Sequence, residues 1–272
     1  NASFQPDWIN GLNEALPAPR PVEHAPLAIS LQNVTFRYPG AAQPALKDVS
    51  IDIPAGAFVA ITGPVGCGKS ALLRAVLGLY PLENGQIRLN GLPLSAIPAE
   101  ERTAQVGYLP QDPFLFSGTI RENISFGMED CDESRIAQSA AAAVLEPDLQ
   151  TFPAGIDTQI GELGTRVSGG QRQRVALARS LAATPTPPGL LVLDDPFSAV
   201  DLDTEALLIE SLRQAFGPAA PESQRATLLL SSHRLAAFPQ ADRIIVLDQG
   251  RILETGSHTE LMAAGGLYAR IF

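Results

Sequence analysis

The sequence predicts an α/β fold with a mostly parallel sheet at its core. Three apolar runs without polar alternation, residues 190–193 (LLVL), 227–230 (TLLL) and 244–247 (IIVL), are typical of parallel strands covered on both faces. A helix is predicted over residues 202–216, between the first two runs, where a parallel sheet needs a crossover. A fourth apolar run, residues 57–62 (AFVAIT), is followed at once by a glycine-rich loop.

That loop, Gly63 to Ser70, reads GPVGCGKS and has the spacing GxxxxGK(S/T). In this pattern small residues let successive backbone N–H groups turn toward phosphate oxygens, Lys69 supplies a positive charge and the Ser70 hydroxyl holds Mg²⁺. Residues 71–78 have helical apolar spacing, so the phosphates would also meet the positive end of a helix. We therefore expect a P-loop nucleoside triphosphatase with a RecA-like parallel core. The expected nucleotide contacts in this segment are Gly63, Pro64, Val65, Gly66, Cys67, Gly68, Lys69, Ser70 and Ala71.

Composition limits the class of protein. The chain has 272 residues, of which 45% are hydrophobic and 18% charged, enough for a large core. Its formal net charge of −10 argues against a nucleic-acid partner, because proteins that bind nucleic acid usually carry a basic patch. Two cysteines provide no disulfide framework, and every apolar run is far shorter than the roughly twenty residues that cross a bilayer.

The N-terminal residues differ from the remainder of the chain. Residues 1–26 contain five prolines and are predicted to form a linker. Because the first residue is Asn rather than Met, we expect a piece of a longer polypeptide, with residues 1–2 consistent with a tag remnant. We assign residues 27–272 to one folded domain.

Two further units are predicted beside the parallel sheet. Residues 27–38 and 46–53 alternate apolar and polar side chains, as half-buried antiparallel strands do, and residues 85–90 add a third strand. These segments predict an antiparallel β subdomain.

The second unit is helical. After a strand at residues 106–109, the sequence is expected to be helical through about residue 181, including the alanine-rich segment 133–144 and the segment 168–181. We therefore place an inserted α-helical subdomain at residues 111–184.

Two carboxylates stand where the 190–193 strand ends. Ligands bind at the carboxyl ends of the strands in an open α/β sheet. We expect Asp194 to reach Mg²⁺ opposite Ser70, directly or through water. Asp195 would then lie nearest the γ phosphate and the attacking water, as a general base.

The segment VSGGQ, residues 167–171, adds a second anion-binding helix start. Ser168, Gly169 and Gly170 would open a helix and present backbone N–H donors. With this segment the chain, over about residues 27–272, resembles the nucleotide-binding domain of an ATP-binding cassette (ABC) transporter, with Val167 in place of the commoner Leu. The resemblance implies that two domains pair head to tail. Ser168, Gly169, Gly170 and Gln171 would close over ATP held by the partner's phosphate loop.

Other positions match the family's motifs in the expected order. The resemblance implies that Tyr38 stacks on adenine, that Gln111 senses Mg²⁺ and the membrane partner, and that His233 contacts the γ phosphate. Residues 198–201 (SAVD) match a segment at the dimer interface.

Several segments resemble the exporter type of the family. These are residues 116–127 (FSGTIRENISFG), 158–164 (TQIGELG), 8–16 and 256–272. In exporters Glu162 would lie in a loop that touches the transmembrane helices. The resemblance implies ATP and Mg²⁺ as ligands and a transmembrane domain in the same polypeptide, ahead of Asn1. It also implies a location at the cytoplasmic face of the membrane.

One position departs from the family pattern, because Asp195 stands where Glu is usual. Its carboxylate is one methylene shorter, so hydrolysis at this site is expected to be weakened while ATP binding survives. Such a departure is familiar in heterodimeric exporters, although a homodimer remains an alternative. Two other readings stay open, a soluble ABC ATPase of DNA repair or translation and a regulatory module that binds ATP without hydrolysing it.

Overall fold

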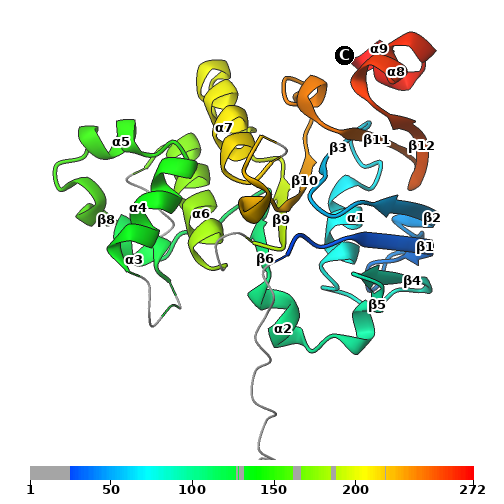
Figure 1. The fold of residues 1–272 in the computed structure, drawn as a ribbon, viewed down its shortest axis with the longest axis horizontal. Helices are drawn as coiled ribbons and strands as arrows, with labels where there is room; N and C mark the ends of the chain where they lie inside the picture. Colours follow the sequence, from blue (N-terminus) through cyan, green and yellow to red (C-terminus); the bar gives the residue numbers. More distant parts are fainter. Residues whose placement is uncertain (1–24, 127, 129–131, 162–166, 185–187, 218) are drawn as a thin grey trace, which may run out of the picture.

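A computed structural model describes residues 25–126, 128, 132–161, 167–184, 188–217 and 219–272 (Figure 1). Its central sheet has six strands in the order β12-β11-β3-β10-β9-β6. The strands are β3 (Phe58–Thr62), β6 (Val106–Leu109), β9 (Leu190–Asp194), β10 (Thr227–Ser231), β11 (Arg243–Asp248) and β12 (Arg251–Gly256). All neighbours pair in parallel except β12, which pairs antiparallel with β11. The predicted parallel core is therefore confirmed.

Both faces of this sheet are buried, as its uninterrupted apolar runs require. Alternate residues of each strand belong to different hydrophobic clusters. In β9, Leu191 and Leu193 pack into one cluster, whereas Leu190 and Val192 pack into the other. Because each face needs an apolar side chain, the sequence of a central strand shows no polar alternation.

A second sheet and one helix cover the first face of the central sheet. The second sheet has the order β2-β1-β4-β5 and is antiparallel throughout. Its strands are β1 (Ile29–Phe36), β2 (Leu46–Ile53), β4 (Asn84–Leu89) and β5 (Leu92–Pro93). Helix α1 (Lys69–Val76) packs in the same hydrophobic cluster as these strands. The predicted antiparallel unit is confirmed, and it lies to the right in Figure 1.

Helices cover the opposite face. Side chains of α6 (Gly169–Ala182), α7 (Leu202–Ala215), α8 (His258–Ala264) and α9 (Leu267–Ile271) pack in the cluster on that face. The helices α3 (Ile120–Ile124), α4 (Glu133–Ala142) and α5 (Glu146–Thr151) extend it to the left in Figure 1. The remaining short elements are α2 (Ala99–Ala104), β7 (Gly118–Thr119), β8 (Gln159–Ile160) and the 3-10 turns Leu94–Ala96, Gly155–Asp157, Glu222–Gln224 and Phe238–Gln240.

The structure corrects several expected element boundaries. The stretch from residue 110 to 181 is not helical throughout, because β7 and β8 pair as a two-stranded antiparallel sheet within it. The helix expected over residues 133–144 ends at Ala142, before Val144 takes a φ of 51°. The helix expected from residue 71 begins two residues earlier, at Lys69. The domain boundaries at residues 27, 111 and 184 stay predictions.

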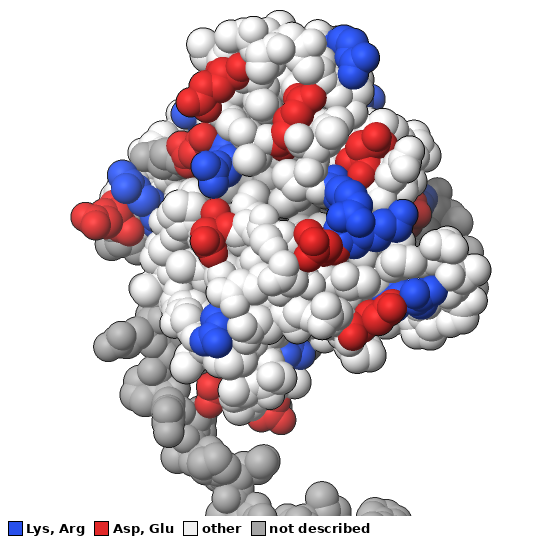
Figure 2. Space-filling view, turned by 90° about the vertical axis from the view of Figure 1, so that its right-hand side faces the viewer, with Lys and Arg blue, Asp and Glu red and all other residues white. Residues whose placement is uncertain are grey.

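The surface carries charges of both signs. Figure 2 shows the face on the right-hand side of Figure 1, where basic and acidic side chains are interspersed rather than gathered by sign. This face offers no continuous basic stripe for a polyanion, in keeping with the formal net charge of −10. No helix in the described part of the chain is long and apolar enough to span a membrane.

Candidate nucleotide-binding site

Strand register brings the predicted site segments to one edge of the central sheet. Ile61 of β3 lies beside Ser231 of β10, and Ser231 lies beside Asp194 of β9. On the far side of β9, Leu193 lies beside Leu109 of β6. The loops that contain the phosphate-loop residues, Asp195, Gln111 and His233 therefore all begin at the carboxyl edge, where α/β sheets bind ligands.

Glycines give the phosphate loop its shape. Gly63 has a φ of 140°, and a Cβ there would lie 2.0 Å from the backbone oxygen of Leu247. Gly68 has a φ of 114°, and its Cβ would lie 2.8 Å from the oxygen of Ala45. Gly66 has a φ of 78° but open space around it. Two of these positions therefore need glycine for both backbone conformation and close packing, and the third for conformation alone.

Lys69 lies beneath this loop, with a side chain that is 8% exposed. Its ammonium donates to the backbone oxygens of Gly63 at 3.0 Å and Pro64 at 3.3 Å. None of the ion pairs in the described ranges includes Lys69. Its charge therefore faces only neutral acceptors, and a phosphate oxygen would be a stronger partner.

Cys67 has no sign of chemical activation. Its side chain is buried, and burial raises the pKa of the thiol above its ordinary value, although the Lys69 ammonium acts in the opposite direction. A thiol with a raised pKa is a poor nucleophile. Cys67 thus serves as a small apolar residue inside the loop.

Ser70 and Asp194 meet across the sheet edge. The Ser70 hydroxyl donates to Oδ1 of Asp194 at 3.0 Å, and the Ser231 hydroxyl donates to the same oxygen at 2.6 Å. The other oxygen, Oδ2, is buried and has no hydrogen-bond partner among the described residues. A buried carboxylate oxygen without a partner is costly unless a ligand completes it.

This arrangement fits Mg²⁺. A hard divalent cation prefers oxygen ligands, and Mg²⁺ usually takes one or two protein oxygens together with water and substrate phosphates. Ser70 and Asp194 would supply those protein oxygens. Within the described residues no cluster of three His, Cys, Asp or Glu side chains could hold a metal alone. The site therefore suits a cation that arrives with a polyphosphate.

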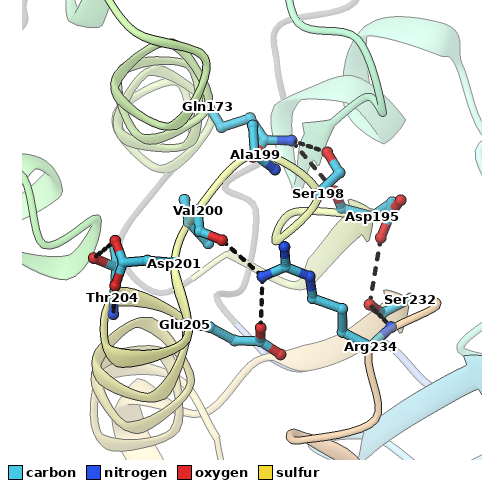
Figure 3. A network of polar contacts seen from close by, with 10 residues as sticks. All are labelled: Gln173, Asp195, Ser198, Ala199, Val200, Asp201, Thr204, Glu205, Ser232 and Arg234. Atoms are coloured by element: carbon cyan, nitrogen blue, oxygen red, sulfur yellow. Dashed lines mark hydrogen bonds and ion pairs between the residues drawn. The ribbon is translucent and has the colours of Figure 1, made fainter.

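Asp195 has an unusual backbone for a residue other than glycine, with a φ of 51°. Its N–H donates to the oxygen of Ser231 at 2.9 Å, and its Oδ1 accepts from the Ser232 hydroxyl at 3.3 Å (Figure 3). Asp tolerates this left-handed conformation better than most residues. The Asp195 carboxylate thus bonds to the residue that directly follows β10.

Tyr38 follows β1 and packs in an aromatic cluster. Its ring meets those of Phe36 and Tyr80 edge-on, at centroid distances of 4.8 and 5.5 Å. Its hydroxyl accepts a hydrogen bond from Nη1 of Arg74 at 3.1 Å. Sequence reasoning identified Tyr38 but missed Tyr80 and Arg74. The only available signal was their position, at the end of α1 and just after it.

Gln111 and His233 are both exposed at the carboxyl edge. Gln111 lies two residues past β6, and His233 lies two residues past β10. Neither side chain has a hydrogen bond to another part of the described chain. The fold thus leaves both side chains open to a ligand or partner.

The VSGGQ segment opens α6 with a capping box. The Ser168 hydroxyl accepts from the N–H of Gln171 at 3.1 Å, and the Gln171 side chain accepts from the N–H of Ser168 at 2.9 Å. The free amide hydrogens of Gln171 donate to Asp148 of α5 at 3.1 Å, and Arg174 donates to the same carboxylate. The helix start is therefore fixed in both conformation and position.

The helices that follow the phosphate loop and the start of VSGGQ pack on opposite faces of the central sheet. Helix α1, after the phosphate loop, packs in the cluster on one face, and α6 packs in the cluster on the other. Glu162 and residues 8–16, which the sequence also singled out, lie outside the described residues.

Comparisons with known proteins agree with this geometry. A family model described as ABC transporter matches residues 46–198. The chain is 39% identical over 240 residues to a probable multidrug resistance ABC transporter ATP-binding/permease protein of Bacillus subtilis, covering 88% of this chain and 39% of that protein. It is 37% identical over 252 residues to an ATP-dependent lipid A-core flippase of Xanthomonas campestris, covering 92% of this chain and 41% of the flippase.

A solved structure gives the same picture. A bacterial Atm1-family ABC exporter with ATP bound matches with a TM-score of 0.82 and 34% identity, over 92% of this chain and 43% of that one. The chain thus spans about two fifths of the length of the relatives it matches.

Proposed function

Because the chain belongs to the ABC transporter family, we propose that it is the ATP-binding and ATP-hydrolysing domain of an exporter and powers the movement of a substrate across a membrane. The observation that carries this proposal is the meeting of Ser70 with Asp194 beneath the phosphate loop, where one buried carboxylate oxygen lacks a partner. The relatives named as a multidrug transporter and a flippase support the exporter assignment.

Binding would use the loop in the form it already has. Lys69 would exchange the backbone oxygens of Gly63 and Pro64 for phosphate oxygens, which are stronger acceptors. The backbone N–H groups of residues 65–71 would hold the β and γ phosphates. Mg²⁺, held by Ser70 and Asp194, would supply charge that neutralises the triphosphate. Tyr38 would stack on adenine.

Hydrolysis would depend on the carboxyl edge. Asp195 would accept a proton from the attacking water. His233 would contact the γ phosphate, and Gln111 would contact the bound Mg²⁺. The Asp195 carboxylate is one methylene shorter than the usual Glu and accepts from the Ser232 hydroxyl at 3.3 Å, so it would reach the attacking water less well. We therefore propose that turnover at this site is slow.

Pairing with a second nucleotide-binding domain would complete the site. The opposite placement of α1 and α6 supports a head-to-tail pair, in which Ser168, Gly169, Gly170 and Gln171 of one domain cap the ATP of the other. We propose a heterodimer, in which this chain's intact VSGGQ segment serves a competent site on its partner. A homodimer is the alternative.

A membrane domain would dock beside Gln111. Phe114 and Phe126 are about half exposed, and Phe116 stacks on Phe126 with ring centroids 4.0 Å apart. Arg179 lies over the Phe116 ring, 5.4 Å from its centroid. An exposed aromatic cluster of this kind marks an interaction surface. We propose that it receives the transmembrane part of the same polypeptide at the cytoplasmic face of the membrane.

The second candidate function is an ATP-binding module that does not hydrolyse, and the position of Asp195 favours it. The experiment that separates the two measures ATP turnover by the purified chain and by its Asp195→Glu variant. We expect slow turnover in the wild type and a rise of roughly tenfold or more in the variant, because the longer side chain reaches the water. Brisk wild-type turnover that the substitution leaves unchanged would contradict the weakened site. No turnover in either protein would favour the binding module.

A further inference from the structure

The segment after Asp195 is held from both sides by side chains that sequence motifs did not single out (Figure 3). Residues 195–201 join the end of β9 to the start of α7. Gln173 of α6 contacts this segment on one side, and Arg234, next to His233, contacts it on the other. The segment therefore links three parts of the proposed ATPase.

Gln173 uses both ends of its amide on this segment. Its Nε2 donates to the Ser198 hydroxyl at 2.6 Å and to the Asp195 backbone oxygen at 3.4 Å. Its Oε1 accepts from the N–H of Ala199 at 3.1 Å. The Gln173 side chain is only 5% exposed, so water cannot readily replace these partners. A side chain of α6 thus determines where Asp195 and the next four residues lie.

The first turn of α6 also packs directly on the segment. A Cβ at Gly170 would lie 2.9 Å from the backbone oxygen of Ala199, and one at Gly169 would lie 3.1 Å from the Ala199 Cβ. Neither glycine position has room for a side chain, so the VSGGQ turn packs closely against Ala199. A shift of one therefore displaces the other.

Arg234 closes the other side. Its Nη1 donates to the oxygen of Val200 at 2.7 Å and to Oε2 of Glu205 at 3.1 Å. Its backbone N–H donates to the Ser232 hydroxyl, which in turn donates to Asp195. The segment is thus tied to the loop that carries His233, and it cannot move away from Gln173 without breaking these contacts.

We propose that Gln173 is a positioning residue that couples the start of α6 to Asp195. This inference rests on the proposed function, in which Asp195 serves this chain's own ATP and the start of α6 serves the partner's ATP. One amide would then connect two nucleotide sites. Because coupling between binding sites is reciprocal, nucleotide at the phosphate loop should stabilise the start of α6 in the isolated chain.

The test is hydrogen exchange measured by mass spectrometry on the 272-residue chain, with and without Mg²⁺ and a non-hydrolysable ATP analogue. Gln173→Met keeps the length of the side chain and removes the amide. Gln138→Met is the matched control, because Gln138 is an exposed glutamine of α4 whose amide, within the described part of the chain, bonds only to Ser134, at 3.0 Å. Ser198→Ala removes one partner of Gln173 at an exposed position and serves if Gln173→Met does not fold.

We expect the nucleotide analogue to slow exchange at residues 63–71 in all variants. In the wild type and in Gln138→Met it should also slow exchange at residues 168–173, by roughly threefold to tenfold, as expected for the net contribution of about one hydrogen bond. In Gln173→Met this second response should be lost, and in Ser198→Ala it should be reduced. A merely structural role of Gln173 would speed exchange equally with and without nucleotide.

The outcomes separate the two proposals. Two results overturn the coupling when the nucleotide analogue slows exchange at residues 63–71. One is that Gln173→Met responds at residues 168–173 as the wild type does. The other is that the wild type shows no response at residues 168–173. If Gln173→Met does not fold, an equal response at residues 168–173 in Ser198→Ala and in the wild type overturns the coupling. No slowing at 63–71 in the wild type means that the proposed nucleotide site itself is wrong.

Discussion

Replacing Arg234 with alanine should cost more stability than its partly exposed position suggests. Its partner Glu205 is 0% exposed, and Oε1 of Glu205 already lacks a hydrogen-bond partner among the described residues. Without the guanidinium, a fully buried carboxylate would lose its ion-pair partner, and the backbone oxygen of Val200 would lose its bond at 2.7 Å. Breaking a buried ion pair from one side costs about 3–5 kcal/mol. Because the Arg234 side chain is 37% exposed, water reaches part of the site, and we expect about 2–4 kcal/mol.

The assay is urea unfolding of the purified chain, followed by circular dichroism. Glu205→Gln removes the buried charge but keeps an acceptor for Arg234, so it should stay within about 1 kcal/mol of the wild type. Combining it with Arg234→Ala should recover at least half of the loss. As a surface control, Glu83→Gln removes an exposed ion pair with Arg37 at 2.8 Å and should leave the urea midpoint almost unchanged. An Arg234→Ala variant as stable as the wild type, or a double variant no better than the single one, would refute the reasoning.

Three further predictions concern other parts of the chain. Gly63→Ala should abolish measurable MgATP binding, because its Cβ would lie 2.0 Å from a backbone oxygen. A Cβ at Gly66 would have no atom within 4 Å, so Gly66→Ala should lose less than about tenfold in affinity, from backbone strain alone. Nucleotide titration of the two variants compares these affinities. Tyr38→Ala should weaken ATP binding by roughly tenfold and Tyr38→Phe by much less, since stacking on a base is worth about 1–3 kcal/mol; equal losses in both would contradict stacking. Burial raises the pKa of Tyr268 to about 12 in the folded chain, so its stabilising contribution is complete below the unfolded value near 10 and is lost as the pH rises toward 12. Unfolding measured as the pH rises through this range should therefore show a steeper loss of stability in the wild type than in Tyr268→Phe. Parallel stability curves for the two proteins would contradict the raised pKa of Tyr268.

The central strands and the phosphate loop could be predicted because each is encoded locally. The run LLVL and the loop GPVGCGKS need no distant residue to be recognised. Strand β12 was missed because it lies at an edge of the sheet, where its residues alternate between exposed and half-buried and none is fully buried. Its hairpin turn at Gln249 and Gly250, both with positive φ, was nevertheless a readable signal.

Other features had weaker or no local signals. Helix α8 begins with a capping box between Ser257 and Glu260, which are three positions apart, and this pattern is visible in the sequence. By contrast, the contacts of Gln173 with Ser198 and of Arg234 with Val200 join residues 25 and 34 positions apart. Only the packing of α6 and the order of β9 and β10 bring them together. The sequence could therefore locate the chemistry but not the connections that hold it in place.

Calorimetric titration of MgATP into the wild-type chain and its Lys69→Ala variant tests the central claim most directly. We expect one site in the wild type and an affinity at least roughly 100-fold lower in the variant, because the ammonium that bonds to the loop carbonyls of Gly63 and Pro64 is lost. A circular dichroism spectrum matching the wild type would show that the variant is folded. Equal affinity in the two proteins, or no binding to the wild type, would contradict the claim that this loop holds the triphosphate.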